Sequence, residues 1–122
     1  MAAPLLFISL FVNVAVAGFM GLALGFGLKR ALAGMERVFG PDSPSRRILA
    51  SVYLAIAAAS VVAVIHAGVR RPIASVLLPL QICYKLLTLV FVTDRSNPVP
   101  WANLGISILH GATLWAMWTE AE

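Results

Sequence analysis

Four long apolar stretches dominate the pattern of hydrophobic and polar positions along the chain. They cover residues 4–28, 44–68, 72–93 and 98–118. Each is close to the roughly 20 residues that an α-helix needs to cross about 30 Å of hydrocarbon. The last three begin at Pro44, Pro72 and Pro98, and proline is a favourable residue in the first turn of a helix. The pattern predicts an all-α fold in which residues 1–122 form a single transmembrane domain of four helices.

The connections predict how these helices are arranged. The last three stretches are joined by only a few residues, which makes them antiparallel neighbours and predicts an up-down four-helix bundle. Positive charge near the helix ends is unequal on the two sides, and cytoplasmic loops carry the excess of Lys and Arg. One side carries Lys29, Arg30, Arg37, Arg46, Arg47 and Arg95, and the other carries Arg70 and Arg71. This asymmetry predicts that both termini lie on the non-cytoplasmic side.

Composition supports a membrane protein. The chain is 61% hydrophobic and 11% charged, whereas soluble proteins average about 45–50% apolar and about 25% charged residues. The excess must face the lipid bilayer, so we expect a multi-pass protein of a bacterial inner membrane. The net charge of +4 is confined to short stretches without interleaved aromatic residues, which argues against nucleic acid as a partner. A single cysteine, Cys83, excludes an internal disulfide and a two-cysteine metal or redox site.

Small residues recur at helical spacing in three of the four stretches. Such residues let two helix backbones approach closely in lipid, where burial of apolar surface contributes little to helix association. We predict that they mark packing faces, either inside the bundle or against another protein. These positions are Gly18, Gly21 and Gly25 in the first stretch, Ala55 and Ala58 in the second, and Gly105 in the fourth.

Polar side chains form a stripe in each of the last two helices. Gln81, Tyr84 and Lys85 share one face of the third stretch, and Ser107 and His110 share one face of the fourth. Lys85 and His110 lie at depths of roughly 13 and 16 Å from the same end, so the stripes can face each other. Lys85 is the one charge well inside a span, and no span carries an intramembrane carboxylate. Three interpretations follow: Lys85 extends toward the headgroups, it binds an anionic group of a partner, lipid or cofactor, or it is deprotonated.

Two resemblances bear on function. The chain is similar to small multidrug transporters in length and helix number, but that family exchanges protons at a carboxylate in the first span, where this chain has Asn13. Residues 106–118, with His110 followed by Leu114 and Trp115, resemble the pigment-binding helix of bacterial light-harvesting polypeptides. The second resemblance implies a tetrapyrrole bound at His110, although Ile106 stands where that family has a small residue. A haem shared with His66 is not expected, because the two histidines differ in depth by roughly 12 Å.

These observations favour a protein that is not an enzyme and holds no metal or cofactor. The sequence shows no nucleotide-binding loop, catalytic triad or metal cluster. We expect a non-catalytic accessory subunit of a larger membrane assembly, of respiratory, photosynthetic or monooxygenase type, with other integral membrane subunits as partners. The alternative is a small transporter or a binder of a lipid-like ligand that uses the stripe of Gln81, Tyr84, Lys85, Ser107 and His110. Tetrapyrrole binding through His110 is the second alternative.

Overall fold

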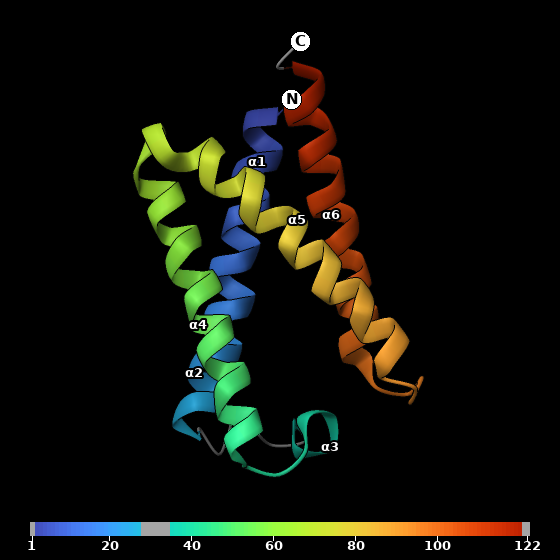
Figure 1. Ribbon diagram of the computed structural model, residues 1–122. Coiled ribbons are helices and arrows are strands. Elements are labelled where there is room, and N and C mark those ends of the chain that lie inside the picture. Colours follow the sequence, from blue (N-terminus) through green and yellow to red (C-terminus); the bar gives the residue numbers. More distant parts are fainter. Residues whose placement is uncertain (1, 28–34, 121–122) are drawn as a thin grey trace.

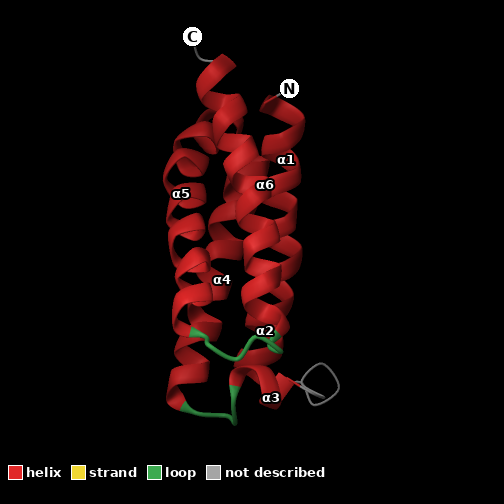
Figure 2. Ribbon diagram, turned by 90° about the vertical axis from the view of Figure 1, so that its right-hand side faces the viewer, coloured by secondary structure: helices red, strands yellow, loops and turns green. Residues whose placement is uncertain are grey.

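Four long helices lie side by side in the computed structural model, which describes residues 2–27 and 35–120 (Figures 1 and 2). The described residues contain helices and loops but no strand, so the all-helical prediction is confirmed. The first long helix is continuous but changes its winding, from α1 through a π-helical segment, η1, to α2. The elements are α1 (Ala2–Val12), η1 (Asn13–Ala17), α2 (Gly18–Phe26), α3 (Met35–Phe39), α4 (Pro44–Ile65), α5 (Ala67–Phe91) and α6 (Pro98–Glu120).

The hairpin between α4 and α5 is tighter than the sequence predicts. The predicted boundary at Pro72 is wrong, because α5 begins at Ala67 and only His66 separates it from α4. Arg70 explains how so short a turn is possible. Its guanidinium donates hydrogen bonds to the carbonyl oxygens of Ala63 (2.9 Å) and Val64 (2.7 Å), which lie in the last turn of α4. These carbonyls have no partner within their own helix, so the arginine replaces the water or loop that would otherwise satisfy them.

The start of α4 follows the predicted pattern. Ser43 is the N-cap residue, and its hydroxyl accepts a hydrogen bond of 3.2 Å from the backbone N–H of Arg46. Pro44 follows in the first turn, where its missing N–H costs no hydrogen bond. The short helix α3 precedes this cap and lies across the same end of the molecule (Figure 1).

The long helices contact one another in a closed ring. The first long helix packs against α4 and α6, and α5 packs against the other side of both. The two ends of the described chain lie close together in this ring: the backbone N–H of Ala2 donates to Oε1 of Glu120 at 2.8 Å. One apolar core, around Leu6, Leu78 and Leu114, lies near these ends. A second, around Leu24 and Tyr53, lies nearer to α3, and the buried Asn13 comes between the two cores in the sequence of the first long helix.

Three helices of the described part are long and apolar enough to cross a membrane: Ala2–Phe26, Pro44–Ile65 and Ala67–Phe91. The helix α6 has a similar length but directs its polar residues inward. Asn103, Ser107 and His110 are buried, whereas Trp101 and Trp115 are exposed. A hydropathy average along the sequence counts the buried polar residues together with the exposed apolar ones, so α6 has a lower mean hydropathy than its exposed surface alone.

Candidate functional site

A cluster of polar side chains occupies the centre of the molecule. We define the interior polar cluster as Asn13, Gln81, Lys85, Asn103 and His110, each of which is buried. Gln81 and Lys85 are one turn apart on α5, and Asn103 and His110 are two turns apart on α6, so each pair shares a face of its helix. Buried polar groups are costly in an apolar interior unless they bond to one another. Their hydrogen bonds therefore decide what the cluster can do.

Asn13 joins the first long helix to both α5 and α6. Its side-chain amide exchanges two hydrogen bonds with Gln81: Nδ2 donates to Oε1 at 2.7 Å, and Gln81 Nε2 donates to Oδ1 at 3.1 Å. Nε2 of His110 lies 3.1 Å from the same Oδ1 and donates to it when the ring proton is on Nε2. Interhelical hydrogen bonds of this kind fix the relative position of helices in lipid.

The π-helical segment η1 begins at Asn13 and helps to position it. Asn13, Ala17 and Gly21 follow one another at intervals of four residues, and all three are buried. A regular α-helix would turn the last of them about 80° away from the first. The wider π-turn absorbs part of this rotation and keeps all three positions on the buried side of the helix.

Lys85 is buried and pairs inside the chain. Its side chain is 4% exposed, and Nζ donates to Oδ1 of Asn103 at 3.2 Å. Asn103 Nδ2 in turn donates to the hydroxyl of Thr88 at 3.1 Å, and this hydroxyl donates to the carbonyl of Lys85. Nζ also lies 5.1 Å from the centre of the Tyr84 ring, in the range of a cation–π contact. The described buried residues include no carboxylate, so these neutral groups alone accompany the lysine.

Four of the five ligand-binding residues proposed from sequence are fully buried. Gln81, Lys85, Ser107 and His110 are buried, and Tyr84 is half-buried beside them. The hydroxyls of Tyr84 and Ser107 and Nδ1 of His110 are buried without a hydrogen-bond partner among the described residues. Sequence reasoning gave Asn13 no binding role. The signal was present, because Asn13 is a strongly polar side chain in the middle of an otherwise apolar stretch.

His110 is poorly placed for a tetrapyrrole. Its side chain is 0% exposed, and its Nε2 is engaged by Asn13. An axial ligand needs a ring nitrogen that faces a space as wide as the macrocycle, and the void beside Asn13 holds about 10 Å³. That volume suits about one water molecule. No group of three or more His, Cys, Asp or Glu residues in the described ranges is arranged to hold a metal ion.

A larger cavity lies next to the cluster, toward α3. We call it the loop-end cavity; it has a volume of about 190 Å³ between α3, α4, α5 and α6. Its polar lining residues are Tyr53, Tyr84, Thr88, Asn97 and Asn103, and apolar residues such as Phe39 and Leu49 form the remainder.

The small-residue stripes divide into inward and outward ones. Gly18, Gly21 and Gly25 face α4, and a Cβ at Gly21 would lie 2.7 Å from Cγ of Leu54. The other three small residues do not pack within the chain. Ala55 and Ala58 are exposed on α4, and a Cβ at Gly105 on α6 would meet open space. The α4 helix carries small residues on two faces, and it is the face with Ala50, Ala57 and Ala63 that is buried.

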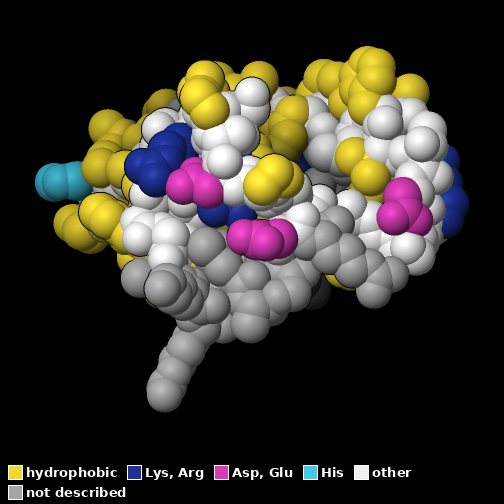
Figure 3. Space-filling model, turned by 90° about the horizontal axis from the view of Figure 1, so that it is seen from below, with side chains coloured by type: hydrophobic (Ala, Val, Ile, Leu, Met, Phe, Trp, Pro, Cys, Tyr) yellow, Lys and Arg dark blue, Asp and Glu magenta, His cyan; other side chains and the backbone are white. Residues whose placement is uncertain are grey.

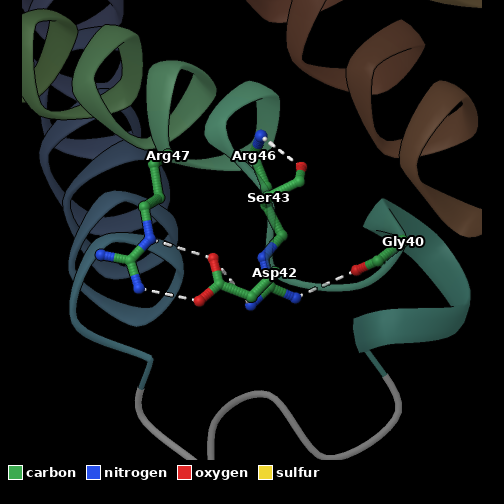
Figure 4. A network of polar contacts seen from close by, with 5 residues as sticks. All are labelled: Gly40, Asp42, Ser43, Arg46 and Arg47. Carbon is green, nitrogen blue, oxygen red and sulfur yellow. Dashed lines mark hydrogen bonds and ion pairs between the residues drawn. The ribbon is translucent and has the colours of Figure 1, made fainter.

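Charged residues near α3 pair with one another (Figures 3 and 4). Arg47 donates two hydrogen bonds to the carboxylate of Asp42, at 3.1 and 2.8 Å, and this bond lowers the pKa of Asp42 below its usual value. The buried Arg46 donates to the carbonyl of Gly40 at 3.0 Å and lies 3.7 Å from Asp42. These contacts close the loop before α4, and the basic residues here are not a free anion-binding patch. Of the basic residues counted for orientation, Lys29 and Arg30 lie outside the described residues.

Comparisons of the chain with protein-family models, with curated proteins and with solved structures find no match. Chemically, the site offers donors and acceptors in fixed positions, a buried amine and an adjacent apolar cavity.

Proposed function

We propose that the chain is a multi-pass membrane protein in which all four long helices cross the bilayer. Three helices have the required length and hydropathy, and α6 packs beside them with its apolar surface outward. The excess of Lys and Arg in the two loops near α3 supports a cytoplasmic location for that end and a non-cytoplasmic location for the chain termini.

Cysteine labelling tests this orientation. Ala3 and Ser45 are exposed at opposite ends of the molecule, and each can be replaced by cysteine in a background in which Cys83 is changed to alanine. A membrane-impermeant thiol reagent added to intact cells is expected to label position 3, whereas position 45 reacts only after lysis. The opposite pattern refutes the orientation.

For its role, we propose a non-catalytic subunit of a larger membrane assembly. The observation that carries this proposal is the outward placement of Ala55 and Ala58 on α4, together with Gly105 on α6. Small residues on a lipid-facing surface add little to packing within the chain but allow another transmembrane helix to approach closely. Lys85 does not support this proposal, because its Nζ already donates to Asn103 within the chain.

Co-purification tests the subunit proposal. Ala55→Leu adds bulk to the exposed face of α4 without entering the core, and Val61→Leu is a matched change at another exposed position of the same helix. We expect other membrane polypeptides to accompany the wild-type chain and the Val61 variant in mild detergent, and to be lost from the Ala55 variant. A wild-type chain that purifies alone refutes the proposal.

A second candidate function, binding of a lipid-like ligand, is favoured by the loop-end cavity. Gln81 and His110 are engaged by Asn13, and the void beside them is the size of one water, so this part of the stripe offers no passage for a transported substrate. Tyr84 and Asn103 line the larger cavity, and Lys85 donates a hydrogen bond to Asn103. Saturable binding of a lipid to the purified chain is the corresponding test.

A further inference from the structure

The loop-end cavity results from the geometry of the α4–α5 hairpin. The two helices are joined through His66 alone, and they diverge from this joint toward the opposite end of the molecule (Figure 1). The short helix α3 lies across the wide end of the gap. Phe39 of α3 and Leu49 of α4 contribute to the wall of the cavity that is left between them.

The cavity has an apolar rim and a wall that donates hydrogen bonds. The Tyr84 side chain lines the cavity, and its hydroxyl is buried without a hydrogen-bond partner among the described residues, so a ligand in the cavity can reach it only if the side chain turns. Asn103, on the same wall, is already engaged by Lys85 and Thr88. Because Lys85 reaches Asn103 through one of the three donors of its ammonium group, two donors remain for a further acceptor.

The charge of the site is one-sided. The residues that line the cavity and the adjacent small void include Lys85 but no Asp or Glu. A cation in a region of low dielectric attracts an anion more strongly than it would in water. A ligand that brings a negative oxygen group therefore fits the cavity better than a neutral or cationic one.

An apolar groove extends the site along the same pair of helices. It has a volume of about 540 Å³ between α4 and α5, and its lining includes Ala59, Val62, Leu77 and Leu80. Leu77 and Leu80 precede Tyr84 by two turns and one turn, so the groove and the cavity follow the same face of α5. A hydrocarbon chain in the groove and a polar head in the cavity are thus arranged in line.

We infer that the chain binds a single-chain amphiphile with a carboxylate head, of the fatty-acid class. The carboxylate accepts from the Tyr84 hydroxyl, once that side chain turns, and from the ammonium of Lys85, and the acyl chain lies in the α4–α5 groove. A cavity of about 190 Å³ admits a compact head of this kind and is smaller than the about 300–1,000 Å³ of pockets that enclose whole drug-sized ligands. This inference rests on the second candidate function and specifies its ligand.

Binding of radiolabelled palmitate to the purified full chain in detergent tests the inference, with hexadecanol as a competitor of equal chain length and no charge. We expect saturable palmitate binding that hexadecanol displaces at least tenfold less effectively than unlabelled palmitate. Tyr84→Phe is expected to weaken binding by about two- to tenfold through loss of one hydrogen bond. Lys85→Met is expected to abolish the preference for palmitate over hexadecanol. Cys83→Ala, an exposed change next to Tyr84 on α5, should leave binding unchanged.

The groove has a separate test. Ala59→Phe narrows the groove but lies outside the cavity lining, so it should weaken palmitate binding and leave octanoate binding unchanged. The carboxylate assignment is overturned if hexadecanol competes as well as palmitate does. It is also overturned if both the Tyr84 and the Lys85 variants keep the preference for palmitate. In either case, ligand binding itself stands. Absence of saturable binding of either probe overturns both the inference and the second candidate function.

Discussion

Gly21→Ala tests how closely the first long helix approaches α4. Gly21 is buried, and the Cβ of an alanine would lie 2.7 Å from Cγ and 3.1 Å from the backbone nitrogen of Leu54. Both distances are shorter than ordinary van der Waals contact, and the second involves backbone that cannot rotate away. The added methyl group therefore has to separate the two helices or displace the Leu54 side chain. Such overpacking typically costs about 1–3 kcal/mol.

Gly18→Ala is the matched control. Gly18 is three residues earlier on the same face of α2, but its new Cβ would lie 3.8 Å from Cβ of Ala57, an ordinary contact. Replacing a helical glycine with alanine favours the helix by about 0.5–1 kcal/mol in both variants. We expect Gly18→Ala to be neutral or stabilising, and Gly21→Ala to be less stable than Gly18→Ala by about 1–3 kcal/mol.

Unfolding in detergent, followed by the loss of helical circular dichroism, measures this difference. Comparison of the two variants cancels the helix-propensity gain that they share and leaves the effect of the contact with Leu54. Equal stability of the two variants refutes the close approach of α2 to α4 at Gly21. Gly21→Leu adds more volume at the same position and should be more destabilising than Gly21→Ala.

Three further predictions concern polar contacts. Asn13→Leu deprives Gln81 and His110 of their hydrogen-bond partner and should lower the free energy of unfolding by about 1–3 kcal/mol. Ser51→Ala, on the exposed face of α4, is the control and should leave the stability unchanged. Equal stability of the two variants contradicts a structural role for the hydrogen bonds between Asn13 and Gln81. Ser43→Ala removes the N-cap of α4 and should cost about 1 kcal/mol in the same assay, with Ser45→Ala as its exposed control. Because Arg47 lowers the pKa of Asp42, their contact stabilises the folded chain above the usual carboxyl pKa and is lost as the pH falls through the lowered one. Asp42→Asn should remove this dependence of stability on pH, and high salt should weaken it in the wild-type chain. If the Asp42→Asn variant keeps the same pH dependence, another group causes it.

The interior polar cluster was predicted in part. The sequence placed Gln81 and Lys85 on one helix face and Ser107 and His110 on another at similar depth, because helical spacing fixes which side chains share a face. It gave no binding role to Asn13, because the partners of this residue, Gln81 and His110, are 68 and 97 residues away in sequence. Contacts of that range follow from how the helices are arranged in space.

The wrong boundary of α5 has a local cause. The start of α5 was misplaced because Pro72 matches the form of a first helical residue, whereas the helix begins at Ala67 and tolerates the proline inside it. What permits the earlier start is the contact of Arg70 with the end of α4, which no local pattern reveals. The sequence left open whether Ala55 and Ala58 pack inside the bundle or against another protein, because equally small alanines occupy both sides of α4.

Local features of the sequence determined the helical character of the chain, the apolar stretches and the Ser43 cap, because apolar periodicity, proline placement and capping act over a few residues. Tertiary structure decided which face of each helix is buried, that Lys85 bonds to Asn103, and that α4 and α5 diverge to leave a cavity. In an apolar chain almost every face can meet lipid or protein at similar cost, so composition does not select among them. Close backbone approach at residues such as Gly21 and a few buried hydrogen bonds make that selection, and both depend on residues that are distant in sequence.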